Sequence, residues 1–293
     1  MARRIGVTSL IYWCPLYLDY SAQLPIETTG VADQFGSAVH ELIYRILSGD
    51  HKGLFDTEED LAWSVLLDSF PGAVISPLTE QVVSEMLNMA RAAKSFAERF
   101  SPEQFEVKFE YGFGNEDLAI IGIADALGEN LVLDWKTGSF MAESHRQQVK
   151  IYATMLWRLG LLRLPATLGV VYLGKAASQG GEAESNVFEF NEEEALVVED
   201  FVERFLQQYS SGNVRPRVSD HCSFCPYGRW CQKTVKDLET NQALHELWRL
   251  QERAGLIQKQ IAPGFTEGIH LTEDFVVEKK GSFYLKVRRK NGT

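Results

Sequence analysis

The sequence predicts an α/β protein with a mixed central sheet and helices packed around it. Two observations lead to this class. Helical patterns fill the first hundred residues, short extended segments follow, and helices then alternate with further strands, an order that favours a sheet covered by helices. The 293 residues also have ordinary globular values, with 45% hydrophobic and 24% charged side chains, which excludes disordered and collagen-like chains.

The N-terminal third predicts four helices. Residues 8–20 are rich in leucine and aromatic side chains and predict a short helix or helix–turn, and residues 33–47 have apolar side chains at helical spacing. Thr57 begins a capping-box pattern that opens a helix through residue 67. Ser76 is a cap residue before a proline and begins a long helix to about residue 100.

The pattern then changes from helical to extended. Three consecutive strands are predicted, at residues 105–113, 118–126 and 130–135. The elements that follow are a helix at 144–159, a strand at 168–173, a loop at 178–186, a strand at 187–190 and a helix at 191–209. Beyond these, residues 238–261 predict a helix and residues 275–287 a hairpin that turns at residues 279–281. We therefore expect a main domain at 1–235, with a helical insertion at about 50–102, and an appendage of helix and hairpin at 236–293.

Charge and hydropathy limit the cellular location of the protein and the classes of molecule that it can bind. No apolar run reaches the roughly 18 residues that a membrane helix needs, and the N-terminus has no apolar signal segment, so we expect a cytoplasmic protein without membrane contact. The net charge of −11 argues against a wholly basic nucleic-acid binder. Residues 204–293, however, carry 15 basic and 9 acidic side chains, a local balance of +6, so residues 1–203 hold −17. A local basic patch can still bind DNA.

Two neighbouring predicted strands each carry a carboxylate near their end. Asp125 closes the run that begins at Gly122, and Asp134 closes the next strand, with Lys136 two residues further on the same face. Two oxygen ligands close together suit Mg²⁺ or Mn²⁺, not zinc. A lysine beside them is placed to orient an attacking water or to neutralise phosphate charge.

These residues belong to a series of four motifs by which the chain resembles the PD-(D/E)XK nuclease superfamily, in its RecB-like branch. The motifs are G-x3-H, G-x-x-D, D/E-x-K and Q-x3-Y, found here in order as Gly36 to His40, Gly122 to Asp125, Asp134 to Lys136, and Gln148 to Tyr152. The resemblance implies a restriction-endonuclease-like core and a divalent metal site. Its implied metal ligands are His40, Asp125, Asp134 and the Trp135 carbonyl.

The resemblance also implies roles for the remaining motif residues. Lys136 would assist the attacking water, so that Lys136, Asp125 and Asp134 form the catalytic set. Gln148 and Tyr152 would line the DNA path.

The four cysteines predict a second metal centre. Cys14 stands near the N-terminus, and Cys222, Cys225 and Cys231 form C-x2-C-x5-C. Four thiolates fit tetrahedral zinc or an iron–sulfur cluster equally well by ligand type, and spacing alone does not separate the two. The arrangement resembles the iron–sulfur nucleases of the same superfamily, which include the CRISPR-associated four-cysteine exonuclease and the AddB nuclease domain. That resemblance implies a [4Fe-4S] cluster joining the chain ends.

The basic tail leaves two interpretations open. Six cations lie within twelve residues, at Lys279, Lys280, Lys286, Arg288, Arg289 and Lys290. A run of charge is often only a solvated face, but here Lys286, Arg288, Arg289 and Lys290 are equally good candidates for phosphate contacts.

Together these patterns predict a divalent-metal-dependent deoxyribonuclease, acting as an exonuclease on DNA that is single-stranded or has free ends. The pathways open to it are recombination, phage DNA metabolism and CRISPR adaptation, with a helicase or adaptation proteins as partners. Two alternatives remain: a non-catalytic iron–sulfur module that binds DNA as a scaffold, and a structure-specific endonuclease.

Overall fold

A computed structural model describes most of the first 212 residues and isolated segments beyond them. The described residues are 3–11, 14–23, 31–71, 73, 75–113, 118–138, 142–212, 222, 225, 227, 231, 268–271, 275–280 and 284–289. The chain divides into two compact units, Met1–His221 and Cys222–Thr293. The expected boundary at 235/236 and the expected helix at 238–261 lie outside the described residues.

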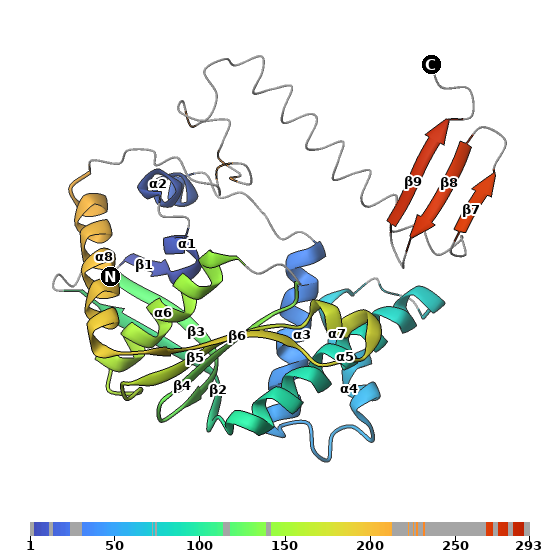
Figure 1. The fold of residues 1–293 in the computed structure, drawn as a ribbon, viewed down its shortest axis with the longest axis horizontal. Helices are drawn as coiled ribbons and strands as arrows, with labels where there is room; N and C mark the ends of the chain where they lie inside the picture. Colours follow the sequence, from blue (N-terminus) through green and yellow to red (C-terminus); the bar gives the residue numbers. More distant parts are fainter. Residues whose placement is uncertain are drawn as a thin grey trace. The chain divides into compact units, whose positions relative to one another are not determined.

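The first unit is built on one six-stranded mixed sheet (Figure 1). Its strands are β1 (Arg3–Gly6), β2 (Gln104–Gly112), β3 (Leu118–Gly128), β4 (Leu131–Lys136), β5 (Ala166–Tyr172) and β6 (Glu184–Phe190). The order β1-β3-β4-β5-β6 runs across the sheet, and β2 pairs with β3. The pairs β2–β3, β3–β4 and β5–β6 are antiparallel, whereas β1–β3 and β4–β5 are parallel. The predicted α/β class with a mixed sheet is confirmed.

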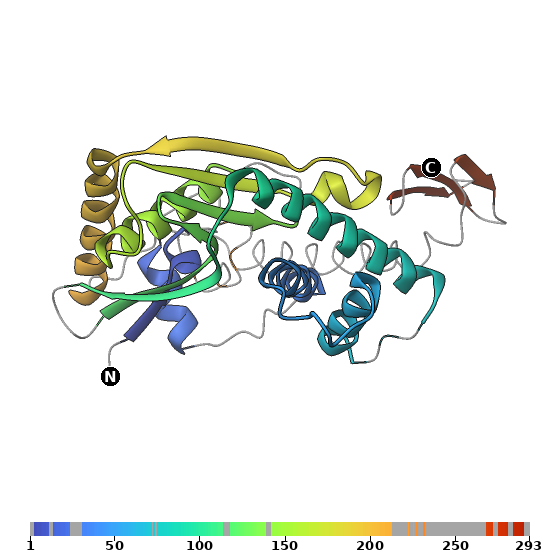
Figure 2. The ribbon, with the colours of Figure 1, turned by 90° about the horizontal axis from the view of Figure 1, so that it is seen from below.

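Helices cover both faces of this sheet (Figures 1 and 2). Around the cluster that includes Val170 pack α1 (Val7–Ile11), α2 (Pro15–Gln23), α6 (Glu143–Arg158) and α8 (Glu192–Ser210). Around the cluster that includes Val171 pack α3 (Val31–Ser48), α4 (Glu58–Ser69), α5 (Pro77–Phe100) and α7 (Gly174–Gln179). Because Val170 and Val171 are successive residues of β5, they point to opposite faces, and each face has its own hydrophobic core.

Capping residues set the ends of the helices as the sequence predicts. Thr57 and Ser76 each accept a hydrogen bond from the backbone N–H three residues later and complete a capping box. Asn191 does the same for α8. At the other end of α5, Ser101 adopts a left-handed conformation with φ of 51°, which ends the helix.

In the first unit, the structure differs from the sequence-based expectation near the N-terminus and between β5 and β6. The segment at 8–20 forms two helices, α1 and α2, and the strand β1 before them was not predicted. Between β5 and β6 the expected loop is shorter, because α7 forms and β6 already begins at Glu184. Short elements of this kind depend on pairing and packing with distant segments, so their local patterns are weak. No helix in the part of the chain that the structure describes is long and apolar enough to span a membrane.

The second unit contains a three-stranded antiparallel sheet. Its strands are β7 (Gly268–Leu271), β8 (Phe275–Lys280) and β9 (Tyr284–Arg289), in that order. The expected hairpin is therefore present as β8 and β9, but the expected turn at 279–281 is wrong. Lys279 and Lys280 both belong to β8, and Lys280 still pairs with Tyr284 of β9.

Candidate metal centre

The candidate centre lies where the sheet opens between β3 and β4. β3 pairs with β2 along one edge, and on its other edge it pairs with β1 through residues 118–121 and with β4 through residues 126–128. Among the described strands, residues 122–125 therefore have no partner on that second edge. Asp125 fills the opening with its side chain, because its Oδ2 accepts a hydrogen bond of 2.6 Å from the Trp135 backbone N–H.

Glu106 of β2 lies beside Asp125, at a point where the side chains of β2 change from one face of the sheet to the other. Phe105 pairs with Ala126 and Val107 with Ala124, so Glu106 lies opposite Asp125. Residues two apart in a regular strand share a face, yet Phe105 packs in the core beside α5 and Val107 in the core beside α6. The φ of Glu106 is 52°, a left-handed conformation that is uncommon for any residue with a side chain. Such strain is often found at functional sites.

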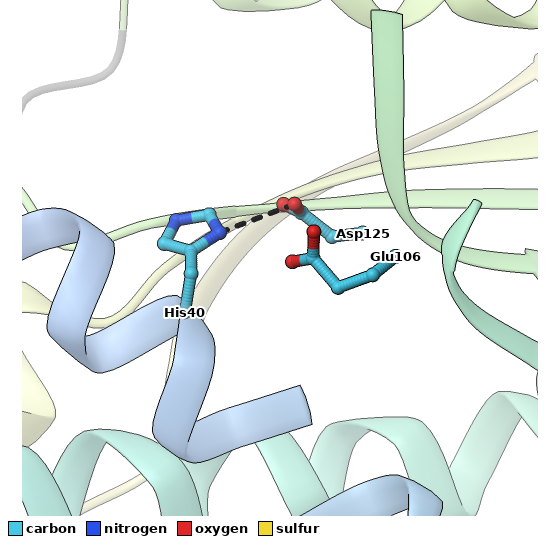
Figure 3. Close-up of side chains that lie close together, drawn as sticks. All are labelled: His40, Glu106 and Asp125. Atoms are coloured by element: carbon cyan, nitrogen blue, oxygen red, sulfur yellow. Dashed lines mark hydrogen bonds and ion pairs between the residues drawn. The ribbon is translucent and has the colours of Figure 1, made fainter. Parts of the chain in front are cut away.

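Three side chains from three elements converge here (Figure 3). His40 comes from α3, Glu106 from β2 and Asp125 from β3, and one ligand atom from each lies within 4.8 Å of the others. His40 Nδ1 is 3.1 Å from Asp125 Oδ1. One imidazole and two carboxylates are ligands that Mn²⁺ and Mg²⁺ accept, and the buried position of Asp125 separates this group from ordinary surface acids.

The charges of this group are in conflict without a cation. Burial, and then the charge of Asp125, raise the pKa of Glu106 to about 7. Burial alone would lower the pKa of His40, but its contact with Asp125 outweighs this and raises the pKa to about 9. His40 and Glu106 therefore hold protons more readily than usual, and these protons offset negative charge that a bound divalent cation would otherwise neutralise.

Asp134 and Lys136 lie next to this group on β4. Asp134 is almost fully buried, and burial raises its pKa, with the nearby charge of Asp125 acting in the same direction. Its Oδ2 is 2.8 Å from Lys136 Nζ, and this contact acts on the pKa of Asp134 in the opposite direction to burial. Asp134 is thus a buried carboxylate whose charge is balanced by a neighbouring ammonium group.

The lysine is held in turn by two residues of α6. Lys136 Nζ donates a hydrogen bond of 2.8 Å to Gln148 Oε1, and Gln148 Nε2 donates one of 2.6 Å to Tyr152 Oη. Both α6 side chains are buried, at 6% and 5% exposure. The two hydrogen bonds connect β4 to α6, so the helix fixes the position of the Lys136 ammonium group.

Gly122 makes room for the end of this chain. A Cβ at this residue would lie 2.4 Å from the ring of Phe109 and 2.9 Å from the ring of Tyr152, closer than real Cβ contacts come. The two rings themselves meet edge to face, with centroids 5.7 Å apart. The glycine thus lets Tyr152 lie against β3, which is a physical reason for the motif glycine three residues before Asp125.

The structure thus brings together most of the residues singled out in the sequence. His40 and Asp125 are in one group, Asp134 and Lys136 adjoin it, and Trp135 contacts Asp125 through its N–H; a role for the Trp135 carbonyl stays a prediction. Glu106 was missed. The signal that could have found it is its place in an antiparallel pair, where the acid opposite Asp125 shares its surroundings.

The cysteines lie in both units. Cys14 directly precedes α2, and the other three belong to the second unit. The Cys225 N–H donates a hydrogen bond of 3.3 Å to the Cys222 carbonyl, so the C-x2-C pair closes one turn. Of the basic tail, Lys286, Arg288 and Arg289 belong to β9, and Lys290 lies outside the described residues.

Comparisons with known proteins give one match by sequence. The sequence profile of the PD-(D/E)XK nuclease superfamily matches residues 12–232. A search of curated proteins finds no match. Among solved structures, SSO0001 is similar over 80% of this chain and 88% of its own, at 17% identity with a TM-score of 0.42. A protein from Eubacterium rectale, described as a candidate exonuclease, is similar over 76% of this chain and 87% of its own, at 12% identity with a TM-score of 0.45.

Proposed function

Because the chain belongs to the PD-(D/E)XK nuclease superfamily, we propose that it is a divalent-metal-dependent deoxyribonuclease that degrades linear DNA from its ends. The observation that supports this most is the convergence of His40, Glu106 and Asp125 beside the Asp134–Lys136 pair. A protein that only binds DNA has no need of a strained acid, a buried carboxylate and a fixed lysine in one place. Preference for DNA ends rests on the motif set and not on a feature of the fold.

The residues divide the chemistry between them. His40, Glu106 and Asp125 would hold Mg²⁺ or Mn²⁺, with Asp134 and the Trp135 carbonyl on its β4 side. When bound, such a cation lowers the pKa of a water molecule and stabilises charge on the scissile phosphate. Lys136, held by Gln148, would orient the attacking water and offset the negative charge that develops on the phosphate.

The assignment is tested by three single substitutions. We expect Asp125→Ala, Asp134→Ala and Lys136→Ala each to lower the rate on linear single-stranded DNA with Mg²⁺ or Mn²⁺ by about 100- to 1000-fold, since each removes a group that acts on developing charge. Asp68→Ala, at an exposed position of α4, is the matched control and should keep full activity. Near wild-type degradation by any of the three would refute the assignment.

Substrate topology separates the exonuclease from an endonuclease. We expect linear DNA to be degraded and covalently closed circles of the same sequence to remain intact. Cutting of the closed circles at a comparable rate would show an endonuclease built on the same centre.

We also propose that Cys14, Cys222, Cys225 and Cys231 hold a [4Fe-4S] cluster of structural importance. The four thiolates provide a complete ligand set, and the resemblance of their arrangement to the iron–sulfur nucleases favours iron over zinc. When ligands are distant in sequence, the free energy of metal binding contributes to folding. Anaerobically purified protein should therefore contain iron and sulfide, and Cys222→Ser should lower its melting temperature. Stoichiometric zinc without iron would overturn the cluster and leave the nuclease assignment standing.

A further inference from the structure

Tyr172 is a buried phenol for which the proposed chemistry has no use. It is the last residue of β5 and is 1% exposed. In the parallel pair of β4 and β5 its register partner is Lys136, so the two side chains stand on the same face of the sheet. Burial, and then the negative charge of Asp134, raise the pKa of Tyr172, which keeps the phenol neutral and able to form hydrogen bonds.

The phenol has a backbone hydrogen bond at Ala142 and a side-chain partner, a histidine on α6. His145 Nδ1 lies 3.2 Å from Tyr172 Oη, and the two rings are 5.7 Å apart. His145 precedes Gln148 by three residues, so both lie on the same side of the helix. It is partly exposed, whereas Gln148 and Tyr152 are buried.

One side of α6 thus reaches three neighbouring strands in turn. Tyr152 lies against β3 at Gly122, Gln148 binds Lys136 on β4, and His145 binds Tyr172 on β5. Neighbouring strands are about 4.8 Å apart, so β5 is roughly 10 Å from the β3 strand that carries Asp125. A DNA strand whose scissile phosphate lies at the metal group has further phosphates on either side of it. A strand that crosses from the metal group toward β5 would bring one of these phosphates to the side of α6 that carries His145.

We propose that His145 contacts a phosphate flanking the scissile one, and that Tyr172 is a positioning residue that fixes the imidazole ring for this contact. The proposal rests on the nuclease function proposed above and adds a substrate-binding position to it. Its competitor is a purely structural role, in which the pair only ties α6 to β5.

The test combines variants with uncharged phosphate analogues. The probe is a linear single-stranded oligonucleotide in which one phosphate at a time is replaced by a neutral methylphosphonate, and KM and kcat are measured with Mg²⁺. On the unmodified strand we expect His145→Ala to raise KM about 10-fold with kcat within about twofold, the scale of one hydrogen bond to a charged group. Wild-type protein should show a similar rise in KM when one particular flanking phosphate is neutralised. On that strand, His145→Ala should add no further rise.

Further variants separate positioning from packing. Tyr172→Phe keeps the buried ring and removes only the hydroxyl, so it should raise KM by a smaller factor, about threefold, and add nothing to His145→Ala. Gln147→Ala is the matched control on the same helix, because that side chain bonds only weakly to Glu143 at 3.5 Å, and it should leave KM unchanged. If His145→Ala lowers the melting temperature, His145→Gln replaces it in the same experiment.

The outcomes are distinct. Unchanged KM in the His145 variants, or a KM rise that persists equally on every modified strand, overturns the proposal and leaves the pair a structural tie. Wild-type protein that does not cut DNA overturns the proposed function and this inference with it. Wild-type protein that cuts DNA while the His145 variants match it overturns the inference alone.

Discussion

At the scale of single residues, the metal centre depends on its charged side chains and also on Gly122, where no Cβ can be accommodated. Gly122 carries no chemistry, but only a glycine lets the rings of Phe109 and Tyr152 meet over β3. Tyr152 in turn receives the hydrogen bond of Gln148, which holds Lys136. A glycine in β3 is thus connected to the position of the lysine on β4.

Alanine substitutions at two motif glycines should therefore have opposite effects. Gly122→Ala forces buried rings apart, so we expect a loss of about 1–3 kcal/mol in the free energy of unfolding, the usual scale of overpacking, together with a lower kcat. Gly36→Ala meets nothing closer than Thr137 Oγ1 at 3.6 Å and lies within α3, so it should stabilise the protein by up to about 1 kcal/mol through helix propensity. Denaturant unfolding measures both. Equal effects of the two substitutions would contradict the packing argument.

The ionised side chain of Glu106 should lower the free energy of unfolding at neutral and alkaline pH. Its pKa is about 7 in the folded protein and near 4.5 when unfolded, so the folded state binds more protons between these values. The stability that the protonated form contributes is fully present below about pH 4.5 and is lost as pH rises through 7. Without added metal, Glu106→Gln should therefore melt above wild type at about pH 8 and close to wild type at about pH 4.5.

The same substitution should weaken metal binding. Mg²⁺ or Mn²⁺ raises the melting temperature of a protein that binds it in the folded state. We expect that rise at about pH 8 in wild-type protein and a much smaller one in Glu106→Gln. A variant that melts below wild type without metal, or that responds to metal as wild type does, would show that Glu106 is outside the centre.

At the scale of elements, α6 is the support of the β4 residues. Its side chains Gln148 and Tyr152 reach into the core, where they are more than nine-tenths buried. Contact of these two side chains with the DNA path remains a prediction from the motif. What their bonds supply directly is a fixed ammonium group on Lys136.

Tyr152→Phe tests this support. The change keeps the ring against Gly122 and removes the hydroxyl that accepts the hydrogen bond from Gln148. Loss of one such bond is worth about 0.5–1.5 kcal/mol, so kcat should fall by a few-fold to about tenfold, while KM for DNA and the metal affinity stay close to wild type. A change confined to KM would instead favour a place in the DNA path.

At the scale of the whole molecule, charge is divided between the two ends of the sequence. The metal centre lies in a strongly acidic part of the chain, and the C-terminal ninety residues have a balance of +6. The second unit carries its densest cations on β9 and just after it. Nothing in the proposed hydrolysis requires these residues, so their expected role is affinity for the phosphate backbone.

Neutralising the four tail cations should weaken DNA binding and leave turnover intact. Removing a cation that binds a phosphate lowers the salt slope of binding by roughly 0.7 for single strands and 0.9 for duplex, because fewer counterions are released. We expect the variant with alanine at Lys286, Arg288, Arg289 and Lys290 to bind DNA more weakly with a flatter salt dependence. Its kcat at saturating DNA should be unchanged. An unaltered salt slope would mean that the tail is a solvated face.

The sequence by itself determined the class of fold and the chemistry of the centre. Periodicity and capping patterns located α3, α4 and α5, because an amphipathic helix and its caps are local features. The motif residues His40, Asp125, Asp134 and Lys136 were recognisable for a similar reason, since each lies at a short, fixed spacing from a motif partner.

Only the tertiary structure decided how these residues meet. The strand β1 is four residues long and forms because β3 offers it an edge, which no local pattern records. Glu106 joins His40 and Asp125 because β2 twists to a left-handed φ opposite Asp125, and this depends on pairing between separate strands. The chain of bonds from Lys136 through Gln148 to Tyr152 needs α6 to return across the sheet. The strand pairings and the Lys136–Gln148 bond join separate elements, and their geometry is fixed by packing, so they become visible only in the folded molecule.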